Sequence, residues 1–271
     1  MNRYTQPGCV AIVTGAASGL GKGLADAYAA RGLQVVYADI NEAGVRAAAA
    51  AAGPRCEAAG LDVADPKACT ELIDDVVARK GRLDLMFNCA GYAVMGEVQD
   101  TSLDDWRRIV DVNLMGSVHC AVQAYKQMAR QGGGQIATIA SLAGLTPMPL
   151  GASYATTKAA LVNFSHTLRC EGHGLGIGVS VICPSFIDTN IFNHAQYRNS
   201  DQQSARSLIP MKFLSVDQAV RGMLAGVDAN RATIVFPFHA KLLWWVQRLL
   251  QQSPNPVTDR VMARVRAGKA R

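Results

Sequence analysis

Three residues whose types could move a proton stand close together in the second half of the chain. Ser141 ends a β-branched run, and Tyr154 and Lys158 follow in a helical segment, four residues apart. Residues at this spacing lie on one face of a helix. A lysine ammonium beside a phenol favours the phenolate, whereas free tyrosine, with a pKa of about 10, is a poor acid–base group at neutral pH. With a serine hydroxyl to hold a substrate oxygen, the set predicts proton transfer to or from an alcohol.

A glycine-rich turn, residues 15–21, follows the apolar run Cys9–Thr14, which is typical of a buried parallel strand. A helix from about Leu20 to Arg31 and a strand, Gln34–Ala38, come next, and Asp39 ends that strand. Glycines let the backbone approach a pyrophosphate, and a helix N-terminus attracts anions. Asp39 would accept hydrogen bonds from ribose hydroxyls and repel a 2′-phosphate. The pattern predicts dinucleotide binding, although an ordinary loop is the alternative for such a turn taken alone.

Strand and helix signals alternate along the rest of the chain. The further predicted strands are Cys56–Leu61, Leu83–Phe87, Gln135–Ala140, Gly178–Cys183 and Thr233–Phe236. The further predicted helices are Asn41–Ala52, Asp65 to about Lys80, Asp104 to about Arg130, Ser153–Gly172 and Asp217–Val227. The alternation predicts an α/β fold, a Rossmann-type doubly wound parallel sheet of about seven strands flanked by helices. Ligands bind such sheets at the carboxyl ends of the strands. Six residues fall just past predicted strand ends, namely Gly15, Asp39, Asp62, Asn88, Ser141 and Pro184.

Asn113 is predicted in the middle of a helix, among small and apolar residues. Burying an unpaired amide costs about 1–3 kcal/mol, so we expect this side chain to have a partner or a function.

Together these motifs resemble the short-chain dehydrogenase/reductase family over residues 8–236, with Asn113, Ser141, Tyr154 and Lys158 where that family has its catalytic tetrad. The resemblance implies that Tyr154 is the general acid/base and that Lys158 lowers its pKa and binds the nicotinamide ribose. It also implies that Ser141 positions the substrate oxygen and that Asn113 holds a water in a proton relay. The implied cofactor-binding residues are Gly15, Ser18, Gly19, Leu20, Gly21, Asp39, Ile40, Asp62, Val63, Asn88, Ala90, Gly91, Tyr154, Lys158, Pro184, Ile187 and Thr189.

Two positions depart from the family pattern: Cys89 replaces an asparagine, and Ser185 replaces the glycine after the sixth strand. Relatives that prefer NADP carry Arg or Lys beside the glycine turn or just after the second strand. Ser18 and Ile40 occupy those positions here, so the resemblance implies NAD rather than NADP.

The expected function is hydride transfer between a nicotinamide cofactor and a secondary alcohol or its ketone, by an enzyme acting on CH–OH groups. The candidate pocket residues are Tyr92, Val94, Met148, Leu150 and Phe186, which suggest an apolar or lipid-like substrate, although core packing also explains them. Two other functions stay open: a non-catalytic NAD-sensing scaffold, and an adaptor at a membrane surface. Binding alone would not require the tyrosine of the tetrad.

The net charge of +6 resides in the C-terminal tail, where seven Lys and Arg and one Asp follow residue 237. Nucleic-acid binding would need a basic face in the body of the protein, so none is expected. Seven scattered cysteines and five histidines show no metal-ligand spacing, so we expect no metal and a reducing, cytoplasmic compartment. The first apolar run is too short for a signal peptide, and no stretch reaches the ~18 apolar residues of a membrane span.

We expect two parts: an NAD-binding catalytic domain, residues 1–236, and an amphipathic basic helical extension, residues 237–271. The apolar stripes expected on the two helices of the extension are Leu242, Trp245, Val246 and Leu249, and then Val257, Val261 and Val265. Such helices can dock on a membrane surface, on the body or on a second subunit, and all three stay open for residues 239–271. Family habit implies a homodimer or homotetramer. Residues 191–210 are expected to form a substrate lid or a mobile loop.

Overall fold

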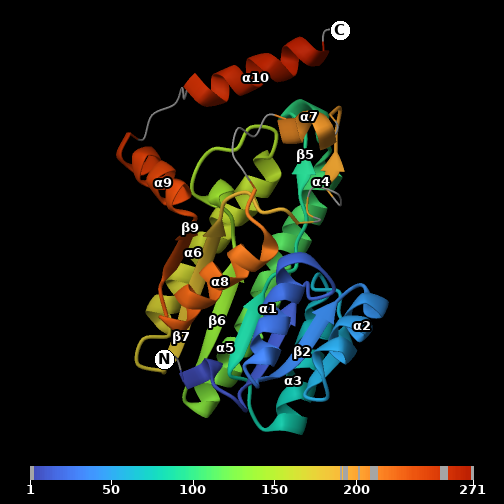
Figure 1. Ribbon diagram of the computed structural model, residues 1–271, viewed down its shortest axis with the longest axis vertical. Coiled ribbons are helices and arrows are strands. Elements are labelled where there is room, and N and C mark those ends of the chain that lie inside the picture. The colour runs from blue at the N-terminus through green and yellow to red at the C-terminus, as the bar shows by residue number, and fades with distance from the viewer. Residues whose placement is uncertain are drawn as a thin grey trace.

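A parallel sheet runs through the centre of the computed structural model, which describes residues 3–189, 191, 195–200, 202–207, 213–250 and 256–269 (Figure 1). Its seven strands have the order β3-β2-β1-β4-β6-β7-β9, and every pair is parallel. The strands are β1 (Val10–Thr14), β2 (Gln34–Asp39), β3 (Cys56–Gly60), β4 (Leu85–Asn88), β6 (Gly134–Ile139), β7 (Ile177–Pro184) and β9 (Thr233–Phe236). The strand order reverses between β1 and β4, which opens a crevice for ligands at the carboxyl ends of these strands.

Helices cover both faces of the sheet (Figure 1). The helices of the described residues are α1 (Gly19–Ala30), α2 (Glu42–Ala52), α3 (Pro66–Lys80), α4 (Leu103–Ile109), α5 (Gly116–Gln131), α6 (Ala152–Glu171), α7 (Gln202–Ser207), α8 (Val216–Asp228), α9 (Phe238–Leu250) and α10 (Pro256–Lys269). The two faces are covered by α1, α2 and α8 on one side and by α3, α5 and α6 on the other. This arrangement confirms the predicted Rossmann-type doubly wound fold.

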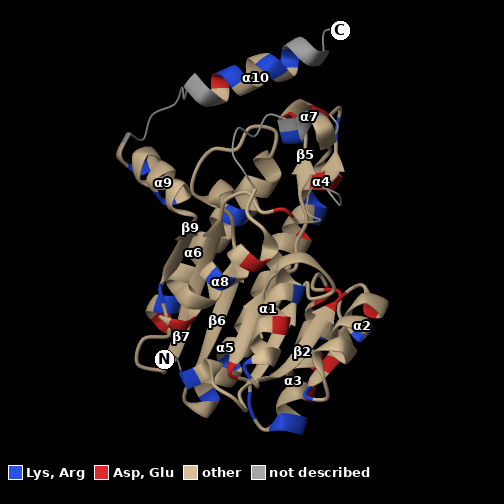
Figure 2. Ribbon diagram, viewed as in Figure 1, with Lys and Arg blue, Asp and Glu red and all other residues tan. Residues whose placement is uncertain are grey.

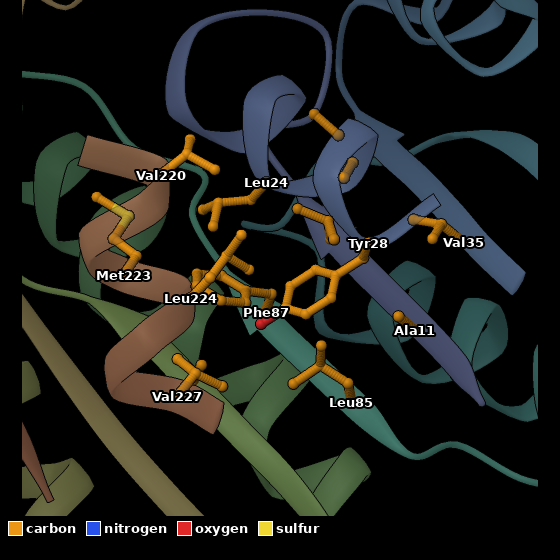
Figure 3. Packing of buried hydrophobic residues seen from close by; sticks show 14 of the residues in the cluster. Ala11, Leu24, Tyr28, Val35, Leu85, Phe87, Val220, Met223, Leu224 and Val227 are labelled. Carbon is orange, nitrogen blue, oxygen red and sulfur yellow. The ribbon is translucent and has the colours of Figure 1, made fainter. Parts of the chain in front are cut away.

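The alternation of side chains along β1 explains why the sheet is covered on both sides. Ala11 and Val13 pack into a core with α1, α2 and α8, and Figure 3 shows Ala11, Leu24 and Val220 in this cluster. Val10 and Ile12 pack into the opposite core, with α3, α5 and α6. The uniformly apolar run that predicted this strand is therefore the pattern of a strand buried on both faces.

Local signals set the ends of α3. The carboxylate of Asp65 accepts hydrogen bonds from the backbone N–H groups of Lys67 and Ala68, and Pro66 begins the helix. Gly81 ends the helix in the left-handed region, with φ 77°. Such signals explain why most predicted helix boundaries agree with the structure within a residue or two.

The predicted helix from Asp104 to about Arg130 is present as an unbroken helical segment, but its hydrogen bonding changes in the middle. It is divided into α4, a π-helical segment η3 (Val110–Met115) and α5. The sequence gives no signal for the change of helical type, because η3 is as apolar as its neighbours.

Several small elements were not predicted. They are the paired strands β5 (Val94–Met95) and β8 (Gln196–Tyr197), α7, and the short 3₁₀ turns η1 (Arg3–Thr5), η2 (Val98–Asp100) and η4 (Leu142–Gly144). Strand β8 and α7 lie within residues 191–210, which were expected to form a lid or a mobile loop. Residues 192–194, 201 and 208–210 of that segment lie outside the described residues.

The two helices after the last strand differ in how they meet the body. On α9 the expected apolar stripe is exposed, with 56% of Leu242, 49% of Trp245 and 77% of Leu249 accessible. On α10, Met262 and Val265 pack against buried residues of the body. Among the described residues, no helix combines the length and apolar character needed to cross a bilayer.

Candidate active site

Tyr154 and Lys158 lie on α6 and are both buried, with 8% and 4% of their surfaces accessible. The ammonium Nζ of Lys158 donates a hydrogen bond to the carbonyl of Ile139, at the end of β6, over 2.8 Å. The same nitrogen lies 5.6 Å from the centroid of the Tyr154 ring. The predicted spacing therefore brings both groups to the carboxyl end of the sheet.

Ser141 lies two residues after the end of β6, in extended conformation, and caps η4. Its hydroxyl accepts a hydrogen bond from the Ala143 N–H over 3.1 Å. Burial raises the pKa of Tyr154 to about 12, and a hydrogen bond with Ser141 opposes this rise. Burial also lowers the pKa of Lys158 to about 8. The expectation that Lys158 lowers the pKa of Tyr154 did not take burial into account. In the protein without ligands burial has the larger effect, because it disfavours the charged form of each group.

Asn113 lies in the π-helical segment η3 and is fully buried. Its amide oxygen accepts a hydrogen bond from the Tyr92 N–H over 3.0 Å, and its amide nitrogen donates to the Tyr92 carbonyl over 2.9 Å. A Cβ added at Gly91 would lie 3.0 Å from that oxygen and 3.7 Å from Lys158 Nζ. Asn113 therefore holds the backbone after β4 beside the lysine, and such π-helical segments are frequent at functional sites.

The glycine turn between β1 and α1 is tightly closed. A Cβ on Gly21 would lie 2.1 Å from the carbonyl oxygen of Gly15, so no other residue fits there without a shift of the backbone. Gly15 itself has φ +69°, which favours glycine. The first N–H groups of α1 have no partner within the helix and face outward from its N-terminus. The turn can therefore receive an anionic group at close range.

Asp39 is fixed at the edge of this turn. One carboxylate oxygen accepts from the N–H of Ala17 over 3.1 Å, and the other accepts from the N–H of Asn41 over 2.9 Å. Ile40, the next residue, is 72% exposed. A fixed carboxylate at the end of β2 can bind hydroxyls and would repel a phosphate.

One cavity of about 740 Å³ joins the glycine turn to the tyrosine and lysine. The predicted site residues that line it are Gly15, Ser18, Gly19, Leu20, Gly21, Asp39, Ile40, Asp62, Val63, Ala90, Gly91, Ser141, Tyr154, Lys158, Pro184, Ile187 and Thr189. Asn113 and Asn88 do not line it. Asn88 is 2% accessible, and its amide donates to the hydroxyl of Thr138 over 3.3 Å, so it links β4 to β6.

The part of the cavity beyond Tyr154 has a mostly apolar wall. Of the five pocket residues predicted from sequence, Tyr92, Met148, Leu150 and Phe186 line it. Val94 does not, because it is 1% accessible within the core beneath. The lining residues that sequence reasoning missed include Met95, Thr146, Gln196, Leu243, Gln247, Thr258 and Val261. Val261 belongs to the apolar stripe predicted for the tail, but the sequence did not show which surface that stripe would cover.

The two departures from the family pattern both lie on the cavity. Burial raises the pKa of the Cys89 thiol to about 12, so this thiol stays protonated at neutral pH. The hydroxyl of Ser185 is buried without a hydrogen-bond partner among the described residues, and it can serve a polar group in the cavity. The described part of the chain holds no cluster of three or more side chains suited to a metal ion.

Comparison with known proteins agrees with this geometry. Residues 9–200 match the family model described as short chain dehydrogenase. The chain is 36% identical to meso-2,3-butanediol dehydrogenase of Serratia marcescens over 185 residues, which cover 68% of this chain and 73% of that protein. It is 34% identical to D-threitol dehydrogenase of Mycolicibacterium smegmatis over 206 residues, or 75% and 79% of the two chains.

A solved structure extends the likeness to the whole fold. The crystal structure of a short chain dehydrogenase/reductase from Burkholderia phymatum in complex with NAD matches with a TM-score of 0.84 and 26% identity, over 92% of this chain and 97% of that one. The family match, the relatives and the shared fold lead to one conclusion: the chain belongs to the short-chain dehydrogenase family of oxidoreductases.

Proposed function

We propose that the protein is an NAD-dependent oxidoreductase that interconverts a secondary alcohol and its ketone, with an apolar or lipid-like substrate. The observation that carries this proposal is one cavity that joins the glycine turn to Ser141, Tyr154 and Lys158. The names of the two relatives, dehydrogenases of a butanediol and of threitol, support a CH–OH substrate. The similar protein from Burkholderia phymatum was crystallised in complex with NAD, which supports NAD as the cofactor here.

The residues around the glycine turn fit a dinucleotide. The close approach at Gly15 and Gly21 and the first N–H groups of α1 suit a pyrophosphate, and the fixed carboxylate of Asp39 suits ribose hydroxyls. The same carboxylate favours NAD over NADP by repulsion. The predicted cofactor-binding residues that line the cavity would hold this group. The hydroxyl of Ser185, which has no partner within the described part of the chain, offers one more polar contact. When bound, the nicotinamide supplies the acceptor or donor of the hydride.

In this proposal the chain itself handles the proton. Tyr154, with a pKa of about 12, is protonated at neutral pH and can donate to a ketone oxygen. In the reverse direction it must accept the alcohol proton, and the ammonium of Lys158 would stabilise the phenolate that precedes this step. The Ser141 hydroxyl would hold the substrate oxygen. Asn113 would act by holding the backbone after β4 beside Lys158, and a relay water would use the same amide.

Replacement of Tyr154 by Phe tests the proposal. The variant should lose turnover by about 10²–10⁴-fold, which is the usual contribution of a general acid–base group. Its affinity for NAD, measured by calorimetry, should stay within about threefold of wild type, because the hydroxyl is one contact among many. Wild-type rates in the variant would refute the role of Tyr154. NAD binding by a wild-type protein that oxidises no alcohol would favour the scaffold function instead.

We also propose that residues 1–236 form the catalytic domain and residues 237–271 an extension, and that the protein works in the cytoplasm as a homodimer or homotetramer. The family's oligomeric habit supports the assembly, which would bring the helices that carry Asn113 and Tyr154 against their counterparts. Light scattering of the purified protein measures the assembly, and a monomer at micromolar concentration would contradict it.

A peripheral membrane contact is a second proposal, and the exposed stripe of α9 favours it. Leu242, Trp245 and Leu249 are all at least 49% accessible, and α9 carries Lys241 and Arg248 but no acidic residue (Figure 2). Apolar and cationic faces of this kind bind anionic lipid surfaces. The intact protein should float with anionic liposomes, and a W245Q/L249Q variant should not. Absence of flotation by the intact protein would overturn the proposal and favour docking on a second subunit.

A further inference from the structure

The C-terminal helix α10 packs against a buried apolar group of the body. Met262 and Val265 contact a buried apolar group that includes Tyr154, Leu150 and Met95. In Figure 1, α10 lies across the top of the molecule, beyond the carboxyl ends of the strands and near β5. These contacts bring a segment about a hundred residues distant in sequence against the buried group to which Tyr154 belongs.

The tail helices also form part of the cavity wall. Thr258 and Val261 of α10 and Leu243 and Gln247 of α9 line the same cavity as Tyr154. A helix that served only to cover the core would bury its apolar stripe without facing a cavity. On α10, Met262 and Val265 pack against the body, whereas Thr258 and Val261 face the cavity.

Charge is unevenly distributed along this wall. Among the described lining residues, the charged side chains are Asp39, Asp62, Arg108 and Lys158, and none of them comes from the tail helices. The tail is the most basic part of the chain, but its described cations, Lys241, Arg248, Arg260, Arg264 and Arg266, do not line the cavity. The described residues of the tail helices therefore contribute no charge to the cavity wall, and Leu243 and Val261 give it apolar surface beside the neutral Gln247 and Thr258.

An ion pair fastens α10 to the body. The guanidinium of Arg266 contacts the carboxylate of Glu97 at 3.1 Å, and the Glu97 side chain is only 7% accessible. Glu97 follows β5 and precedes η2, so the pair connects α10 to the segment that carries Met95 on the cavity wall.

We propose that α10 forms the roof of the substrate pocket and selects substrates whose reacting carbon carries an extended apolar chain that reaches Val261. The proposal rests on the oxidoreductase function and names the substrate class of that site. Arg266 is a positioning residue, because it fixes the helix without touching the substrate.

Chain-length selectivity tests the roof. We would measure kcat/KM with NAD for 2-butanol, 2-octanol and 2-dodecanol in wild type and in V261F, which fills the cavity from α10. The ratio of kcat/KM for 2-dodecanol to that for 2-butanol should fall by about tenfold or more, since an overfilled apolar site excludes a long chain. The matched control is A263F, two residues away on the exposed side of α10, and it should keep the wild-type ratio.

A second pair of variants tests the fastening of the helix. R266Q removes the ion pair between α10 and Glu97 and should raise KM for 2-dodecanol by about three- to tenfold. The change in kcat should be smaller, because α10 positions the chain and not the reacting atoms. The control is R264Q, which removes an exposed cation from the same helix and should leave this KM unchanged. Equal effects of the two variants would overturn the positioning role.

A binding measurement separates this inference from the proposed activity. Titration with a dansyl-labelled undecyl alcohol, followed by dye fluorescence, needs no turnover. V261F should weaken probe binding by about tenfold relative to wild type and A263F. The proposal that α10 forms the roof of the pocket would be overturned if wild type, V261F and A263F had the same probe affinity and the same ratio of kcat/KM for 2-dodecanol to that for 2-butanol. Failure to oxidise any alcohol, with probe binding still lost in V261F, would refute the activity and leave the pocket assignment standing.

Discussion

Replacement of Lys158 by Met should make the stability of the protein less dependent on pH. The folded protein lowers the pKa of Lys158 from its usual 10.5 to about 8 through burial. Below about pH 8 both states hold the proton, and the folded state bears the full cost of a buried ammonium. Between about pH 8 and 10.5 only the unfolded chain holds it, so wild-type stability should rise by about 1.4 kcal/mol per pH unit, or about 3 kcal/mol in all.

The assay is urea unfolding of wild type and K158M at intervals between about pH 7 and pH 10, in reducing buffer. Methionine has no proton to lose, so the free energy of unfolding of wild type minus that of the variant should increase across this range. The lost hydrogen bond to the Ile139 carbonyl destabilises the variant by about 1–3 kcal/mol at every pH. The test is therefore how the difference in unfolding free energy changes with pH, and not its absolute size. Tyr154, with its raised pKa of about 12, affects stability only above about pH 10.

The matched control is K126M, which removes a lysine from the exposed side of α5. Its stability difference from wild type should stay constant over the same range. The reasoning would be refuted if the difference for K158M also stayed constant to within about 0.5 kcal/mol, because the ammonium would then be no more costly in the folded state than in water.

Three further predictions concern single contacts. G21A should weaken NAD binding by about tenfold or more, because its Cβ would lie 2.1 Å from the Gly15 carbonyl oxygen; wild-type affinity in a calorimetric titration would contradict this. D39A should lower the ratio of kcat/KM for NAD to that for NADP by about tenfold, since a repulsive charge is removed, and an unchanged ratio would exclude that role. R198Q should lower the urea-derived free energy of unfolding by about 1–3 kcal/mol, because buried Asp105 loses a partner at 2.6 Å; unchanged stability would show that this ion pair is too exposed to contribute.

The sheet and the glycine turn were predictable because their signals are local. A strand buried on both faces is a short apolar run, and the residue after it is at the carboxyl end of the sheet wherever the strand lies. This is why Gly15, Asp39 and Ser141 could be assigned to one edge before any contact was known. Asn88 ends β4 at the same edge of the sheet, but its amide donates to Thr138 and it does not line the cavity.

What could not be predicted depends on contacts between distant segments. The β5–β8 pair joins residues about a hundred positions apart, and the Arg266–Glu97 pair joins residues still further apart, so neither leaves a periodic trace. The apolar stripe of α10 was visible, but the surface it covers was not. The pKa of Tyr154 was misjudged because the sequence shows its charged neighbour and not its burial.

Transfer of deuterium from a labelled alcohol to the cofactor tests the central claim most directly. The protein would be incubated with NAD and 2-octanol that carries deuterium on the carbinol carbon, and the nicotinamide product would be analysed by mass spectrometry. We predict reduced cofactor with one deuterium per molecule and 2-octanone in equal amount, both absent with the Y154F variant. Reduced cofactor without the label, or no reduced cofactor with any secondary alcohol or ketone pair, would contradict the assignment.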